Sequence, residues 1–252
     1  MTNAGIQLYS VRDLDVPLAE VLEQVAAAGY NGVEFAHRYA DADTETITSA
    51  LTELELDVVG AHVGMDALES DPDAVIDRYQ PVDCQTFIVP HFPPKHFETA
   101  SAVESLAARL NRVGEALEAR GAEFVYHNQA HEFQPLANGE TAFDRLIAHT
   151  NESVKFEFDV GGAITAGVDP TSILTEISNQ TPLVHLKDVA APNPSPETTQ
   201  QSVLPGEGDV PLDEIATIAK ELNTDWLVFE HDDPSSPTQA LKRGGEVTTS
   251  LI

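Results

Sequence analysis

Histidine, carboxylate and amide side chains recur at the ends of short apolar segments along the chain. These polar ends are Gln7, Glu34, His62, His91, His127, Asp159, His185 with Lys187, and Glu230 with His231. Imidazoles and carboxylates bind divalent metals and transfer protons. One such residue alone is more often structural, so the repetition at eight successive segments is what predicts a functional site.

Three of these ends have the composition of a metal site. Asp159, His185 and Glu230 end three successive apolar segments, so their side chains can converge on one ion. Mixed carboxylate and imidazole ligands suit Mn²⁺, Mg²⁺, Co²⁺ or Zn²⁺. A fourth ligand is expected from Glu132, which lies in HNQAHEF just past the fifth segment.

The elements that must position these residues alternate regularly. Strands are predicted over 5–10, 32–36, 58–63, 86–90, 123–127, 154–159, 183–187 and 226–230. Segments with helical periodicity follow at 16–28, 44–54, 71–79, 99–120, 140–149, 170–178, 211–222 and 236–251. Strict alternation predicts a parallel sheet, and eight units in 252 residues match a single-domain (β/α)₈ TIM barrel spanning 1–252. A doubly wound open sheet is the alternative, but no glycine-rich phosphate loop follows the first strand.

A barrel also explains why the polar residues fall where they do. Active sites of such barrels form at the carboxyl ends of the strands. Residues two apart on a strand share a face, so His185 and Lys187 point the same way, as do Glu157 and Asp159. The longest irregular stretch, 189–208, follows the seventh strand and is expected to be an active-site loop.

Composition excludes several classes of partner. The chain has 42 acidic and 13 basic residues, a net charge of −29, which disfavours nucleic acid and anionic membrane surfaces. No apolar run is long enough to span a membrane. The only cysteine, Cys84, excludes an intrachain disulfide. Residues 1–6 lack the pattern of a secretory signal, so a cytoplasmic location is expected.

The acidic residues are scattered along the chain rather than gathered in a tail. Such a surface repels itself in dilute buffer and is screened in salt. This pattern predicts a halophilic protein; an ordinary acidic protein is the alternative.

Eight sequence motifs, taken in order, resemble the sugar phosphate isomerase/epimerase superfamily, the xylose isomerase-like TIM barrels. They are GIQLYSVRD, GYNGVEFA, GAHVG, FVYHNQAHEF, FEFDVGGAITAGVDP, VHLKD, LPGEGDVPLDEI and LVFEHD. The resemblance covers nearly the whole chain. It is greatest to members whose fifth strand carries a YHNH motif followed by FEF.

The resemblance implies a divalent metal held by Glu132, Asp159, His185 and Glu230, with Glu132 and Glu230 also acting as paired acid and base. It also implies that His62 and Lys187 contact substrate oxygens and that Glu207 lies in a loop closing near the site. The remaining strand-end residues, Gln7, Glu34, His91 and His127, are expected to contact substrate. Two departures bear on the substrate: Gln129 replaces the second histidine of YHNH, and Gly161-Gly162 replace a bulky residue after Asp159.

These residues predict a sugar or keto-sugar isomerase or epimerase. The reaction removes a proton next to a carbonyl, a divalent metal stabilises the enediolate, and two carboxylates move the proton. Lys187 is expected to donate to the developing oxyanion. A neutral substrate is favoured, since Asp232 and Asp233 after the eighth strand would repel phosphate.

The same residues are compatible with other functions. A lyase or dehydratase acting on a keto-sugar or keto-inositol would use the same enolate and metal site. A metal-dependent endonuclease on this fold needs a basic DNA-binding face, which the net charge opposes. A binding barrel without enzymatic activity is the third alternative. A homo-oligomer is compatible with the sequence.

Overall fold

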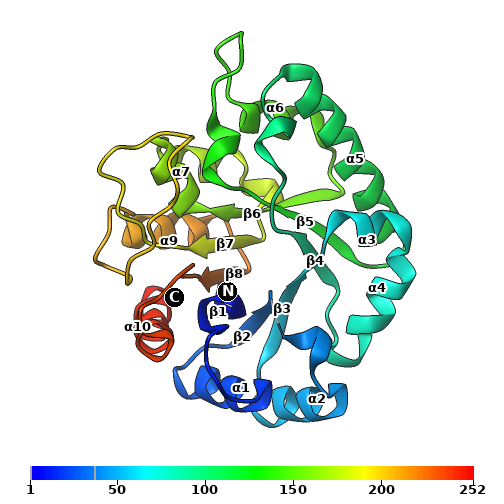
Figure 1. Ribbon diagram of the computed structural model, residues 1–252, viewed down its shortest axis with the longest axis vertical. Coiled ribbons are helices and arrows are strands. Elements are labelled where there is room, and N and C mark those ends of the chain that lie inside the picture. The colour runs from blue at the N-terminus through cyan, green and yellow to red at the C-terminus, as the bar shows by residue number, and fades with distance from the viewer. Residues whose placement is uncertain (1, 37) are drawn as a thin grey trace.

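Eight parallel strands close into a barrel in this computed structural model, which describes residues 2–36 and 38–252. The strands follow one another around the barrel in chain order, and β1 pairs with β8 to close it. Helices surround the strands on the outside (Figure 1). The predicted TIM barrel is confirmed.

The strands are β1 (Asn3–Gln7), β2 (Gly32–Phe35), β3 (Asp57–His62), β4 (Thr86–Val89), β5 (Glu123–His127), β6 (Val154–Asp159), β7 (Leu183–Leu186) and β8 (Trp226–Phe229). The helices are α1 (Leu18–Ala27), α2 (Thr44–Glu53), α3 (Met65–Ser70), α4 (Pro72–Tyr79), α5 (Ala100–Glu118), α6 (Ala142–His149), α7 (Val160–Ala166), α8 (Pro170–Glu176), α9 (Leu212–Glu221) and α10 (Pro237–Leu251). Short 3₁₀ helices are η1 (Leu8–Val11), η2 (Tyr39–Asp41), η3 (Gln80–Val82), η4 (Pro94–His96), η5 (Ala130–Phe133) and η6 (Ser178–Gln180).

Side chains that point into the barrel form two layers of different chemistry. The lower layer is apolar and consists of Val59, Ile88, Val125, Leu183 and Val228, with Trp226 packed against it. Because side chains alternate along a strand, the interior positions two residues further along are His127 on β5, His185 on β7 and Glu230 just after β8. The polar site therefore rests on an apolar layer that closes it from below.

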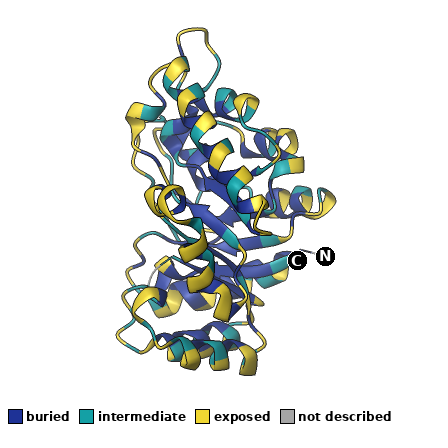
Figure 2. Cartoon of the chain, turned by 90° about the vertical axis from the view of Figure 1, so that its right-hand side faces the viewer, coloured by how far each residue is buried: buried dark blue, intermediate teal, exposed yellow. Residues whose placement is uncertain are grey.

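The core between strands and helices is buried, whereas the outer faces of the helices are exposed (Figure 2). Short polar side chains accept hydrogen bonds from the first turn of many helices, as helix N-termini require. These N-caps are Asp43, Asp71, Thr99, Thr141, Asp159, Asp169 and Ser236. In the described residues, no helix is both long and apolar enough to cross a membrane.

The predicted elements differ from the structure mainly at their ends. The first strand ends at Gln7 rather than at residue 10, since the Gln7 side chain accepts a hydrogen bond from Tyr9 N (2.6 Å) and begins η1. Helices α3 and α7 were not predicted. Helix α7 carries Gly161 and Gly162, which favour loops in a sequence, but the Asp159 carboxylate caps its first turn through Gly162 N (3.1 Å).

Candidate metal centre and active site

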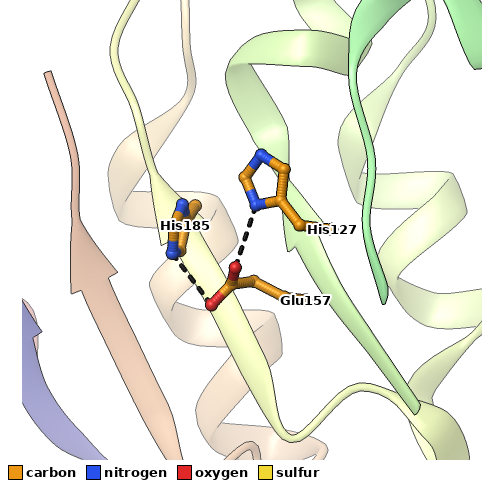
Figure 3. A group of neighbouring side chains, drawn as sticks. All are labelled: His127, Glu157 and His185. Atoms are coloured by element: carbon orange, nitrogen blue, oxygen red, sulfur yellow. Dashed lines mark hydrogen bonds and ion pairs between the residues drawn. The ribbon is translucent and has the colours of Figure 1, made fainter. Parts of the chain in front are cut away.

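A histidine–glutamate–histidine row lies buried inside the barrel. Glu157 on β6 pairs in register with His127 on β5, and His185 lies on the neighbouring strand β7. Glu157 Oε2 lies 2.9 Å from His127 Nδ1, and Oε1 lies 2.8 Å from His185 Nε2 (Figure 3). Burial opposes ionisation of Glu157, but His185 and hydrogen bonds from histidines hold its pKa well below the usual range. This carboxylate is therefore charged and fixes both rings.

Glu34 and His62 extend this row toward β2 and β3. His62 Nε2 lies 2.7 Å from Glu34 Oε1, and Glu34 Oε2 lies 3.1 Å from His185 Nε2. Burial alone would lower the pKa of His62, but Glu34 and Glu157 outweigh it and raise this pKa to about 9. His62 is thus an imidazolium at neutral pH, and it is slightly exposed, with 11% of its side chain accessible.

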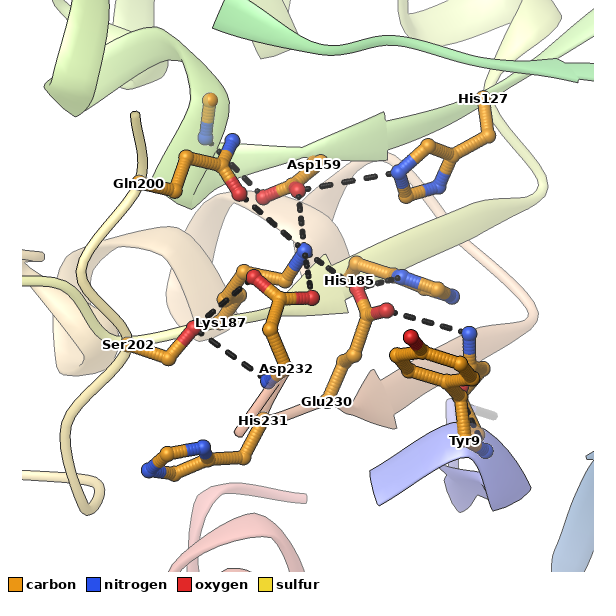
Figure 4. A network of polar contacts seen from close by, with 12 residues as sticks. Tyr9, His127, Asp159, His185, Lys187, Gln200, Ser202, Glu230, His231 and Asp232 are labelled. Atoms are coloured by element: carbon orange, nitrogen blue, oxygen red, sulfur yellow. Dashed lines mark hydrogen bonds and ion pairs between the residues drawn. The ribbon is translucent and has the colours of Figure 1, made fainter. Parts of the chain in front are cut away.

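Lys187 forms the centre of a second cluster nearer the solvent. Its ammonium lies 3.0 Å from Asp159 Oδ2, 2.7 Å from Glu230 Oε2 and 3.1 Å from Asp232 Oδ1 (Figure 4). Glu230 also contacts His185 Nδ1 at 2.9 Å. Asp159 and Glu230 therefore meet at Lys187, and Glu230 also meets His185, but the third residue whose ligand atom lies near those of both carboxylates is His127 rather than His185.

The charges of this second cluster depend on one another. Burial would lower the pKa of Lys187, but Asp159, Glu230 and Asp232 raise it well above the usual value. Burial would raise the pKa of Glu230, but Lys187 and His185 hold it well below its usual range. A buried positive charge between two buried carboxylates marks a place where this protein stabilises a cation.

The side chains at this place fit a divalent metal. Ligand atoms of His127, Asp159 and Glu230 lie within 4.8 Å of one another. Ligands bound tetrahedrally at about 2.0–2.2 Å from a zinc ion lie about 3.3–3.6 Å from one another. Asp159 Oδ2 already lies 3.7 Å from His127 Nε2; it is buried and, among the described residues, has no well-formed hydrogen bond in addition to its ion pairs with Lys187 and His127. Carboxylate and imidazole donors with an available buried oxygen are the donor set that Mn²⁺, Co²⁺ and Zn²⁺ accept.

Two other groups of the described residues have similar spacing: His127–Glu157–His185 and Glu34–His62–Glu157. Their carboxylates are already paired with histidines at 2.7–3.1 Å. These pairs orient the rings of His127 and His185, as second-layer carboxylates do for histidines at metal sites.

Glu132, the expected fourth ligand, belongs to none of these groups. Its carboxylate accepts hydrogen bonds from the Tyr126 hydroxyl (2.5 Å) and from Gln129 N (2.7 Å), and it is fully buried. Burial raises the pKa of Glu132 to about 8, against these hydrogen bonds, which lower it. In this arrangement His127, rather than Glu132, lies beside Asp159 and Glu230.

The other expected site residues fall into two sets. A pocket of about 630 Å³ at the carboxyl end of the barrel, called here the mouth pocket, is lined by Gln7, His62, His91, His127, Lys187 and Glu230, among others. Gln7 also donates to Glu230 Oε1 (3.1 Å). Glu207 lies elsewhere, in a surface pocket beside α10 that shares no lining residue with the mouth pocket.

The structure brings three further residues to the site that the sequence did not identify as metal-binding, catalytic or substrate-binding residues. Glu157 shares a strand face with Asp159, so this spacing could have identified it. Asp232 and Gln200 contact Lys187 Nζ at 3.1 and 3.2 Å. Gln200 arrives on the loop between β7 and α9, and no local pattern in the sequence places it there.

Asp188, next to Lys187, fastens this loop. Its buried carboxylate accepts hydrogen bonds from four backbone N–H groups, those of Val189, Gly206, Gly208 and Val210. Gly162 allows the Gln200 side chain of this loop to approach α7 closely, since a Cβ at position 162 would lie 3.0 Å from Gln200 Nε2. Gly162 thus leaves room that Gln200 occupies, whereas Gly161 leaves room for the backbone of Lys187, since a Cβ there would lie 2.8 Å from Lys187 O.

Comparisons with known proteins agree with this architecture. The inosose dehydratase of Clostridium beijerinckii is 23% identical over 250 residues, covering 86% of this chain and 83% of that protein. A sugar phosphate isomerase/epimerase from Parabacteroides distasonis has a TM-score of 0.80 at 18% identity, covering 97% of each chain. The IolI protein, solved with a zinc atom, has a TM-score of 0.81 at 12% identity, covering 100% of this chain and 98% of that one. The two structural likenesses show the fold alone.

A family model described as the xylose isomerase-like TIM barrel matches residues 22–251. The match covers all of the elements that carry the site except β1 and η1. The chain belongs to the xylose isomerase-like TIM barrel family.

Proposed function

We propose that this protein is a divalent-metal-dependent dehydratase acting on a keto-polyol of the inosose type. The observation that carries the proposal is the convergence of Asp159, His185, Lys187 and Glu230 at the mouth of the barrel. The curated relatives matched over most of their length, named inosose dehydratases, support elimination over isomerisation. The substrate is a small neutral molecule rather than a nucleic acid.

Asp159 and Glu230 are proposed metal ligands together with His127, whose ligand atom lies within 4.8 Å of theirs, and with His185, which contacts Glu230 at 2.9 Å. When bound, the metal supplies Lewis acidity to the substrate carbonyl. The carboxylates of Asp159 and Glu230 match its charge, and Glu157 holds the rings of His127 and His185 in place.

Different residues of the chain carry out the two proton transfers. Glu230 is charged and lines the mouth pocket, so it can accept the proton from the carbon next to the carbonyl. The electron pair of that C–H bond forms a C=C bond as the C–O bond at the next carbon breaks. Lys187 donates a hydrogen bond to the carbonyl oxygen as it gains charge, and the His62 imidazolium protonates the departing hydroxide to give water.

Isomerisation or epimerisation is the second candidate, because it begins with the same proton abstraction. It favours two carboxylates on opposite sides of the substrate, for which Glu132 and Glu230 are the predicted pair. The Glu132 carboxylate contacts Tyr126 and Gln129 N and does not line the mouth pocket, which Glu230 and Asp232 line from the same strand end. This arrangement supports elimination.

The test is incubation of the Mn²⁺-supplemented protein with scyllo-inosose in buffer containing KCl, followed by mass spectrometry. We expect a product lighter by one water. A product of unchanged mass would identify an isomerase, and absence of reaction on inosose and on a panel of neutral keto-sugars would overturn the proposal.

A further inference from the structure

The mouth pocket adjoins a larger depression, called here the side cleft. The side cleft has a volume of about 1300 Å³, compared with about 630 Å³ for the mouth pocket. Typical small-molecule pockets measure roughly 300–1,000 Å³. Tyr9, Gln129, His131 and Asp232 line both, so the two spaces adjoin. A single six-membered ring bound at Lys187 and Glu230 would leave the side cleft unused.

The walls of the side cleft have the chemistry of a carbohydrate subsite. Tyr9, at the boundary, is one of two large hydrophobic residues that are exposed in the described chain, with 38% accessibility. The Arg12 guanidinium lies 3.8 Å from its ring centroid and steadies the ring. Pro94, Pro135 and Pro196 add rigid apolar faces. Flat apolar faces of this kind match the C–H face of a sugar ring.

Polar groups of the side cleft can bind hydroxyls. Gln134 and Gln200 both line it. The Gln134 Nε2 atom has no hydrogen-bond partner among the described residues, whereas Gln200 Nε2 packs against Gly162 and Gln200 Oε1 accepts from Lys187. Buried amide donors without acceptors are costly, and a ligand hydroxyl would provide the acceptor.

The charge of the side cleft selects against anions. Four carboxylates line it, those of Glu98, Glu197, Asp232 and Asp233, against the single guanidinium of Arg12. Arg12 already binds the Asp232 carbonyl oxygen and lies 3.4 Å from the Asp233 carboxylate. A phosphate or carboxylate substituent would therefore be repelled.

We propose that the side cleft is a subsite for a neutral glycosyl substituent, so that the substrate is a keto-polyol or keto-sugar carrying a second ring. The inference rests on the proposed function, since it takes the mouth pocket as the place of the reacting ring. The second ring would stack on Tyr9 and bind the Gln134 amide through a hydroxyl.

Binding of unreactive ligands to the Mn²⁺-supplemented protein tests this subsite without turnover. The probes are myo-inositol, its neutral galactoside galactinol, and myo-inositol monophosphate, measured by calorimetry or ligand-observed NMR. We expect galactinol to bind at least about tenfold more tightly than myo-inositol, and the monophosphate to bind more weakly than galactinol. Equal affinities, no measurable binding of galactinol, or tightest binding of the monophosphate would each overturn the inference.

Single-residue variants test which side chains make galactinol bind more tightly than myo-inositol. Tyr9→Ala and Gln134→Ala should reduce the galactinol preference to about threefold or less, whereas Gln201→Ala should preserve it, since Gln201 is exposed and does not line the cleft. A preference unchanged in both test variants would refute the subsite. A protein that prefers galactinol yet dehydrates neither inosose nor any neutral keto-sugar of the panel would overturn the proposed function and leave the subsite standing.

Discussion

At the scale of single residues, Glu230 makes the most varied contacts of the proposed catalytic residues. It contacts Lys187, His185 and Gln7 and faces the mouth pocket. Glu230→Gln keeps the shape but removes the charge, so turnover should fall by at least about 10²-fold. The exposed Glu221 of α9 offers a matched control, and Glu221→Gln should retain wild-type turnover. Steady-state kinetics with inosose as substrate measures the turnover of both variants. Near-full turnover in Glu230→Gln would refute the assignment of Glu230 as the base.

The Lys187 ammonium and a bound metal ion would compete for the carboxylates of Asp159 and Glu230. Lys187→Met leaves these buried carboxylates unpaired, so the metal-free protein should lose roughly 3–5 kcal/mol of stability. Added Mn²⁺ should restore more stability to this variant than to wild type, since binding to the folded state stabilises it. Thermal unfolding with and without Mn²⁺ measures both effects, with the exposed Lys242→Met as the control. An Mn²⁺ effect no larger in Lys187→Met than in wild type would contradict the shared position.

The fourth metal ligand can be decided between His127 and Glu132. The geometry predicts that His127→Gln weakens Mn²⁺ binding by about tenfold or more, and that Glu132→Gln changes it by less. If Glu132 were the ligand, the proton on it would compete with the metal, so affinity would rise with pH up to about 8. Calorimetric titration with Mn²⁺ at several pH values distinguishes the two. A larger loss in Glu132→Gln together with that pH dependence would restore the sequence-based assignment.

At the scale of elements, the loop between β7 and α9 depends on Asp188. Asparagine would replace one carboxylate oxygen by an NH₂ donor, so two of the four backbone N–H groups that this carboxylate binds would lose their acceptor. Asp188→Asn should therefore speed proteolytic cleavage within 189–210. Asp209 accepts a backbone hydrogen bond from Ala191 in the same loop, and Asp209→Asn should have a smaller effect. Equal cleavage rates in the two variants would argue against this anchoring role.

The positions of the strands and most helices could be predicted from the sequence. Alternation of apolar and amphipathic segments predicted all eight strands, because each barrel strand is a short apolar run. It failed at α7, where two glycines hide a helix begun by the Asp159 cap. It also failed to anticipate the contact of Glu132 with Tyr126, since both oxygens of that carboxylate are positioned by tertiary packing and by the turn of η5.

At the scale of the whole molecule, a net charge of −29 should make stability depend on salt. Scattered acidic residues repel one another in the compact state, and salt screens them. The unfolding temperature should therefore rise markedly between 0.1 M and multimolar KCl. Thermal unfolding across this range tests the halophilic hypothesis, and an unfolding temperature independent of KCl would refute it.

The central claim is that three strands far apart in sequence hold one cation at the mouth of the barrel. Anomalous diffraction from crystals grown with Mn²⁺ tests it most directly. We predict a single strong peak within bonding distance of Asp159, His185 and Glu230, with the Lys187 ammonium displaced from between the two carboxylates. No peak there, with Lys187 still bridging Asp159 and Glu230 at saturating Mn²⁺, would contradict the account.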